Sequence, residues 1–188
     1  IEPHEIIFLG TAGGKFAINK QLRASGGIIL RIKGIQFHID PGPGSLIKAN
    51  EYGVSLRANN ILLCSHSHLG HCNDINVVID AMTHSGLDKR GILIGSRSLV
   101  QGRENERSYL TRKHKGRIEK ILALDAGNTV KFGQDIELKT LKTVHKDETG
   151  LGFKIFGDNF VIGFSGDTAY FDGLIEELKG SNILILNV

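Results

Sequence analysis

The feature that most constrains this chain is a run of three histidines within six residues, His66, His68 and His71, which directly follows a short apolar stretch. That stretch, Ile61 to Cys64, has the length and composition of a strand buried inside a sheet. A turn at the end of such a strand can aim histidines at positions i and i+2 toward one point, and a zinc-like ion takes about four ligands near 2.0–2.2 Å. The run therefore predicts a metal site at the end of a buried strand.

Two residues far along the chain are candidates to complete the ligand set. Ile136 and Leu138 alternate with charged residues, the period of a half-buried strand, and this strand leads to His145. A later apolar strand ends at Asp167. Taken alone, Asp167 would be interpreted as a turn former between two small residues. The remaining histidines are interpreted as ordinary residues: His4, His38, His84 and His114.

Size and composition place the chain among globular proteins. It has 188 residues, of which 40% are hydrophobic and 23% charged, so we expect a single domain over residues 1–188. No apolar run reaches the roughly 20 residues that cross a bilayer and no signal peptide opens the sequence, so the expected location is the cytoplasm, without membrane contact. Two cysteines, Cys64 and Cys72, are too few for a disulfide framework. Both are interpreted as packing residues, with a thiolate ligand at Cys72 as the alternative.

The apolar periodicity predicts mixed α and β structure. Strands are expected at 5–9, 27–32 and 35–39, with a tight turn at Lys33-Gly34 joining the last two. Helices are expected from Asp74 to about Ser85 and from Tyr170 to Lys179, and a buried strand at 182–188. Residues 96–120 are polar, with no predicted element, and Gly10 to Gly14 is predicted to be a loop. A phosphate-binding loop at Gly13-Gly14-Lys15 is excluded because its spacing is wrong and Phe16 replaces the required Ser or Thr.

The histidine run resembles the signature of the metallo-β-lactamase superfamily, in which two histidines, an aspartate and a third histidine follow a strand. Gly70 stands where that aspartate is expected. Three further segments resemble the RNase Z-like branch of the superfamily: Leu9-Gly10-Thr11, Asp40-Pro41-Gly42 and Ser165-Gly166-Asp167-Thr168.

The resemblance implies an αβ/βα four-layer sandwich, with two mixed sheets face to face and helices on the outer faces. It also implies one or two Zn²⁺ ions, with Mn²⁺ or Fe as alternatives, bound by His66, His68, His71, His145 and Asp167. Asp167, which would bridge two ions, and His71 would be the catalytic residues. Because Gly70 has no side chain, the second ion is expected to be weakly held and activity to be impaired. The family's last ligand histidine has no counterpart here, so we expect the chain to lack its C-terminal end.

The predicted activity is hydrolysis of a phosphodiester by hydroxide that the metal generates from bound water. RNA is a candidate substrate or partner because residues 103–120 hold seven Lys or Arg against three Glu, in a chain of net charge +3. Tyr109 is a candidate for stacking on a base, and the basic residues expected to contact RNA are Arg112, Lys113, Lys115 and Arg117. Three alternatives stay open: a solvated charged face, a thioester, lactone or lactam hydrolase, and a noncatalytic nucleic-acid-binding protein. A homo-oligomer is a further alternative.

Overall fold

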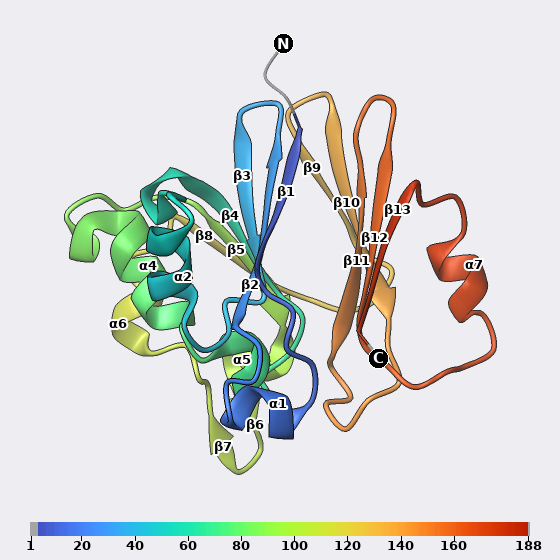
Figure 1. The fold of residues 1–188 in the computed structure, drawn as a ribbon, viewed down its shortest axis with the longest axis horizontal. Coiled ribbons are helices and arrows are strands. Elements are labelled where there is room, and N and C mark those ends of the chain that lie inside the picture. Colours follow the sequence, from blue (N-terminus) through green and yellow to red (C-terminus); the bar gives the residue numbers. More distant parts are fainter. Residues whose placement is uncertain (1–3, 188) are drawn as a thin grey trace.

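Two mixed β-sheets stand face to face in the computed structural model, which describes residues 4–187 (Figure 1). In the first sheet the order is β1 (Glu5–Gly10), β2 (Ser25–Ile32), β3 (Ile35–Ile39), β4 (Asn59–Cys64), β5 (Ile92–Ser96) and β8 (Lys120–Leu124). In the second sheet the order is β13 (Ile183–Asn187), β12 (Val161–Asp167), β11 (Leu151–Phe156), β10 (Ile136–Lys142) and β9 (Thr129–Phe132). Each sheet combines antiparallel and parallel pairs, as the predicted fold requires.

Helices cover the outer faces of both sheets, which completes the four layers (Figure 1). Outside the first sheet lie α2 (Ser45–Glu51), α4 (Ile75–Thr83) and α6 (Arg112–Lys115). Outside the second lies α7 (Leu174–Leu178), which contacts β10 and β12. The other short elements border the site end of the molecule or connect strands: α1 (Lys15–Asn19), α3 (Leu69–Cys72), α5 (Arg97–Gln101), the 3-10 turns Leu56–Ala58 and His84–Gly86, and the hairpin β6 (Gly102–Arg103) with β7 (Glu106–Arg107). The αβ/βα sandwich expected from the sequence is confirmed.

Strand β4 shows why its sequence is continuously apolar. Ile61 and Leu63 pack into the core between the two sheets, whereas Leu62 and Cys64 pack into the core beneath the helices. Successive side chains of a strand point to opposite faces, so a strand covered on both faces needs an apolar residue at every position. All four side chains are at most 3% exposed. The chain that leaves this strand toward His66 is therefore fixed on both sides.

Sheet topology brings three strand ends to one edge of the sandwich. Strands β10 and β12 both pair antiparallel with β11, so they run in the same direction and end at the same edge. His145 follows β10, and Asp167 is the last residue of β12. The end of β4, in the facing sheet, supplies His66 and His68 to the same place, as the contacts described below show.

Several elements differ from those expected. The Tyr170–Lys179 helix is wrong in length: Gly173 adopts a left-handed φ of 100° and α7 begins only after it. The final strand exists as β13, but it is not buried, because Ile183, Leu184 and Leu186 are all exposed at the end of a sheet. The polar segment 96–120 contains α5, a hairpin and α6, and α1 follows the expected glycine loop. The predicted strand at 182–188 reaches Val188 and the predicted domain includes residues 1–3, all of which lie outside the described residues.

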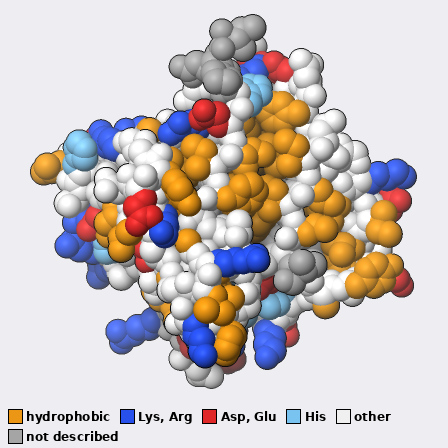
Figure 2. Space-filling model, viewed as in Figure 1, with side chains coloured by type: hydrophobic (Ala, Val, Ile, Leu, Met, Phe, Trp, Pro, Cys, Tyr) orange, Lys and Arg blue, Asp and Glu red, His pale blue; other side chains and the backbone are white. Residues whose placement is uncertain are grey.

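Within residues 4–187, no helix is long and apolar enough to cross a membrane. Apolar side chains gather on the face of the molecule shown in Figure 2, over β1 and toward β12 and β13. Phe8 of β1 and Leu186 of β13 are exposed and line one pocket of about 180 Å³. His71 and Asn187 also line this pocket, so it adjoins the candidate site.

Candidate metal centre

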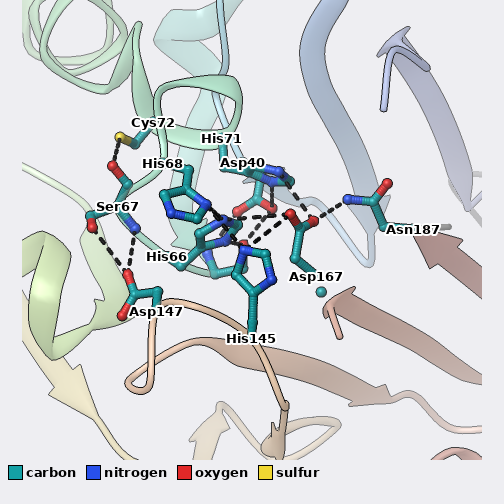
Figure 3. A network of polar contacts seen from close by, with 12 residues as sticks. Asp40, His66, Ser67, His68, His71, Cys72, His145, Asp147, Asp167 and Asn187 are labelled. Atoms are coloured by element: carbon teal, nitrogen blue, oxygen red, sulfur yellow. Dashed lines mark hydrogen bonds and ion pairs between the residues drawn. The ribbon is translucent and has the colours of Figure 1, made fainter. Parts of the chain in front are cut away.

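Four side chains from both sheets converge at the shared edge (Figure 3). One ligand atom from each of His66, His68, His145 and Asp167 can be chosen so that all four lie within 4.8 Å of one another. The Nε2 atom of His66 lies 2.9 Å from Nδ1 of His68, and the Nε2 atom of His145 lies 3.1 Å from that same Nδ1. The Oδ2 atom of Asp167 lies 3.7 Å from Nε2 of His66 and 3.5 Å from Nε2 of His145.

These spacings fit a small divalent cation. Two ligands about 2.1 Å from an ion in tetrahedral geometry lie about 3.4 Å from each other. Four of the six separations, from 2.9 to 3.7 Å, bracket that value, and all six are within 4.8 Å. Three imidazoles and one carboxylate are also a ligand set that zinc, manganese or iron accepts. The residues present therefore fit one metal ion.

A relay through Ser65 fixes the ring of His66. The hydroxyl of Ser65 donates to Oδ2 of Asp40 at 2.7 Å, so its oxygen accepts the proton of His66 Nδ1 at 2.9 Å. With that proton on Nδ1, Nε2 of His66 keeps its lone pair and points it into the cluster. Asp40 itself is held by the backbone N–H of Ser65, at 2.6 Å. The tautomer that a metal ligand needs is thus imposed by the fold.

His71 lies beside the group of four and links the same two carboxylates. Its Nδ1 is 2.8 Å from Oδ2 of Asp40, and its Nε2 is 3.2 Å from Oδ1 of Asp167. Asn187 contacts Oδ1 of Asp167 from the other side, through its side-chain amide. Asp167 therefore turns Oδ1 toward His71 and Asn187, and Oδ2 toward His66 and His145 (Figure 3).

Burial and charge give the histidines opposite protonation. Burial, together with the neighbouring charge on His71, lowers the pKa of His66 to about 4, and burial also lowers the pKa of His68. For His71, burial opposes the charged form, but hydrogen bonds to Asp167 and Asp40 outweigh it and raise the pKa to about 10. Without metal, His66 and His68 are neutral near pH 7, as ligands must be, and His71 carries a proton.

Gly70 has no side chain to bind a metal, and the side chain of Ile18 occupies the space that a side chain at position 70 would enter. A Cβ atom on Gly70 would lie 2.6 Å from Cδ1 of Ile18, which belongs to α1. A side chain at this position would therefore have to displace the flexible end of Ile18. Of the five predicted ligands, four form the close group and His71 stands at its border, with Asp40 occupying its second ring nitrogen.

Sequence reasoning did not assign three residues that this region uses, namely Asp40, Asp147 and Asn187. Asp40 had a signal, because Asp40-Pro41-Gly42 ends a strand abruptly; its backbone has a positive φ of 50°. Asp147 is 1% exposed and accepts hydrogen bonds from both the backbone N–H and the hydroxyl of Ser67. No sequence signal points to Asp147 or Asn187, because Ser67 and Asp167, which they contact in the site, lie 80 and 20 residues away in the chain.

Both cysteines are structural. They are fully buried, and Cys72 donates through its thiol to the carbonyl of Ser67, 3.3 Å away. Burial raises the pKa of Cys72 to about 12, so its thiol stays protonated, and it is not part of the close group of four. The alternative of a thiolate ligand at Cys72 is therefore not supported by the geometry.

The basic residues of segment 103–120 are not all exposed to solvent. Arg117 pairs with Asp80 of α4, and Lys115 donates to the carbonyl of Val100 at 2.5 Å. Arg112 and Lys113 are exposed. Tyr109, the candidate for base stacking, packs partly against the core beneath the helices, and its hydroxyl lies 3.2 Å from the carbonyl of Asn73.

Comparison with known proteins assigns the family. The sequence model described as "Beta-lactamase superfamily domain" matches residues 36–188, a range that includes all five predicted ligands. The chain belongs to the metallo-β-lactamase superfamily. An uncharacterised protein of Methanocaldococcus jannaschii is 35% identical over 187 residues, which are 98% of this chain and 69% of that protein. A ribonuclease Z of Sulfolobus acidocaldarius is 28% identical over 151 residues, 80% of this chain and 48% of that protein.

Solved structures of the superfamily share the fold. The metallo-β-lactamase fold protein YhfI from Bacillus subtilis is 21% identical with a TM-score of 0.75, over 97% of this chain and 70% of that one. The short form of human tRNase Z is 15% identical with a TM-score of 0.68, over 95% and 75% of the two chains. The predicted superfamily and its sandwich fold are thereby confirmed.

Proposed function

We propose that this superfamily member is a metal-dependent hydrolase of phosphodiesters that works with one divalent ion. The observation that carries the proposal is the spacing of the four donor atoms of His66, His68, His145 and Asp167, which suits tetrahedral coordination. When bound, the ion supplies Lewis acidity: it lowers the pKa of water toward about 7 and polarises the scissile bond. Zn²⁺ is the expected ion, with Mn²⁺ or Fe as alternatives.

The chain's own residues prepare this site before any ion arrives. Asp40 and Ser65 set the tautomer of His66, and burial keeps its imidazole neutral. His71 donates from Nε2 to Oδ1 of Asp167, which leaves Oδ2 directed at His66 and His145. Asp167 is thus proposed as ligand and catalytic carboxylate, and His71 as the proton-bearing residue that orients it.

Two observations support a phosphodiester over other substrates of the fold. The curated relatives include a ribonuclease Z, and a tRNase Z is among the solved structures with the same fold. Arg112 and Lys113 are exposed, so they are free to attract a polyanion such as RNA. We propose that RNA contact rests on these two residues, and not on Lys115 or Arg117.

Hydrolysis assays with purified protein loaded with Zn²⁺ or Mn²⁺ test this function. We expect turnover of bis(p-nitrophenyl) phosphate, and a fall to the background rate in His68→Ala, which removes one of the four donors. His84→Asn is the matched control, because His84 is an exposed histidine in a left-handed turn that asparagine tolerates.

The same assays distinguish the alternatives. Turnover of a thioester, a lactone or a β-lactam without any phosphodiester cleavage would replace the proposed substrate class. Absence of all four activities, combined with salt-sensitive RNA binding that survives EDTA, would show a noncatalytic binding protein instead.

A further inference from the structure

Asp147 joins the two loops that carry the ligand histidines. Ser67 lies between His66 and His68, and Asp147 lies two residues after His145. Oδ2 of Asp147 accepts from the backbone N–H of Ser67 at 3.1 Å and from its hydroxyl at 3.0 Å (Figure 3). One carboxylate therefore bridges a loop of the first sheet and a loop of the second.

The remaining contacts of Asp147 anchor it to rigid neighbours. Ser98, in α5, donates its hydroxyl to Oδ2 at 2.5 Å, and Thr149 donates its N–H at 3.1 Å and its hydroxyl at 2.9 Å to Oδ1. Arg103 of the β6–β7 hairpin lies 3.0 Å away and supplies a positive charge. With every contact to a donor, the carboxylate is fully satisfied although it is 1% exposed.

We propose that Asp147 is a positioning residue for metal binding, which holds the His66–His68 turn and the His145 loop at the separation that the ion requires. Its bridge runs through the residue between two ligands, so a shift of Ser67 moves both His66 and His68 relative to His145. The inference rests on the proposed function, because those histidines must be ligands for their spacing to matter. Hydrogen-bonded groups behind metal ligands typically change metal affinity by about 10–100-fold when they are removed.

Binding of Co²⁺, followed by the visible absorption of the tetrahedral ion, tests the proposal. Asp147→Asn keeps the shape of the side chain but places an amide among hydroxyl and N–H donors. We expect Co²⁺ affinity to fall by about 10–100-fold and the absorption band to shift or weaken. Ser67→Ala, a milder change that keeps the backbone N–H bond, is expected to lower the affinity less.

Asp80→Asn is the matched control. Asp80 also pairs with an arginine, Arg117, but joins α4 to the segment after α6, away from the ligand loops. This variant is expected to lower the free energy of unfolding and to leave Co²⁺ affinity and the spectrum unchanged. In a double-mutant cycle, Ser67→Ala should lose most of its effect on affinity in the Asp147→Asn background and keep it in the Asp80→Asn background.

The outcomes separate this inference from the proposed function. If Asp147→Asn binds Co²⁺ with the wild-type affinity and spectrum, while His145→Ala loses binding, Asp147 is only structural and the inference is overturned. An additive cycle between positions 67 and 147 would overturn it as well. Where Asp147→Asn folds poorly, Ser67→Ala is compared with wild type alone, and an unchanged Co²⁺ affinity and spectrum in Ser67→Ala would overturn the inference. If wild type binds no Co²⁺, the proposed function itself fails.

Discussion

The environment of a single side chain can change its protonation state, and His38 is an example outside the candidate site. Its ring is fully buried, with Nε2 2.9 Å from the carbonyl of Gly26. Burial lowers its pKa from 6.5 to about 4, so it stays neutral where an unfolded chain would take up a proton. Its interpretation as an ordinary residue agrees with this environment.

The first prediction concerns the pH dependence of stability. Because the folded pKa of His38 lies below the unfolded one, its contribution is complete above pH 6.5 and is lost as the pH falls toward about 4. The loss amounts to about 3 kcal/mol at most. We expect His38→Gln to flatten the curve of unfolding free energy between pH 6.5 and 4, measured by urea denaturation in EDTA. His84→Asn, at an exposed histidine, should leave the slope unchanged; an unchanged slope in His38→Gln would contradict the account.

The second prediction concerns Gly70, where the superfamily signature has an aspartate. If the missing carboxylate limits activity, Gly70→Asp should raise the rate of phosphodiester hydrolysis by about 10²-fold or more, the size of a typical acid–base contribution. Since a Cβ here meets Ile18, the variant is best made both alone and with Ile18→Val. Gly70→Asn has nearly the same size without the charge and should gain nothing. Equal rates in the Asp and Asn variants would show that Gly70 does not impair the chain.

At the scale of elements, sequence periodicity predicted the strands that carry the site and missed the short elements around it. Strand β4 was recognisable because both of its faces are buried, and β10 because one face is. Helix α5 has five residues, and strands β6 and β7 have two residues each. Elements this short show no hydrophobic periodicity in the sequence. They are fixed by long-range contacts instead, such as that of Ser98 with Asp147.

The sequence also did not reveal that β13 lies at the edge of its sheet with one face uncovered. The apolar residues of β13 suggested a buried strand, but an apolar run does not reveal whether another element covers it. A similar limit applies to the site. His66, His68, His145 and Asp167 were each predicted because they follow or end strands. Asp147 was not predicted, because the residue that it contacts, Ser67, is 80 positions away.

The third prediction separates structural from solvent-facing basic residues in and after α6. Arg117 is 13% exposed and its guanidinium pairs with Asp80, so Arg117→Ala should lower the free energy of unfolding by about 1–3 kcal/mol. The double variant Arg112→Ala, Lys113→Ala should leave stability within about 0.5 kcal/mol, because both side chains are exposed. RNA binding, measured by fluorescence anisotropy at two salt concentrations, should weaken in the double variant. If RNA binding weakened only in Arg117→Ala, at a temperature where that variant is folded, the assignment of Arg117 as structural and of Arg112 and Lys113 as RNA-contacting would be contradicted.

At the scale of the whole molecule, the site depends on the contact between the two sheets. Three of its four donors come from loops at the ends of β4 and β10, which belong to opposite sheets. The core between the sheets includes Phe37 of the first and Phe153 of the second, both fully buried. Any change that lets the sheets move apart should therefore act on stability and on metal binding together.

The fourth prediction follows from this coupling. Phe153→Ala removes a fully buried ring and should cost about 3–5 kcal/mol of unfolding free energy. Saturating Zn²⁺ should raise the melting temperature of wild type, because the ion binds only the folded state, and should raise it less in the variant if the sheets no longer hold the donors in place. Calorimetry with and without EDTA measures both effects. An equal shift in the two proteins would show that sheet packing and the site are independent.

The most direct test of the central claim is the number of metal ions per chain, measured by inductively coupled plasma mass spectrometry after incubation with Zn²⁺ and removal of excess. The account predicts one ion in wild type, and none in His68→Ala or His145→Ala, with His84→Asn retaining one. Absence of metal from wild type, or its retention when a proposed ligand is removed, would contradict the assignment of His66, His68, His145 and Asp167 as a metal centre.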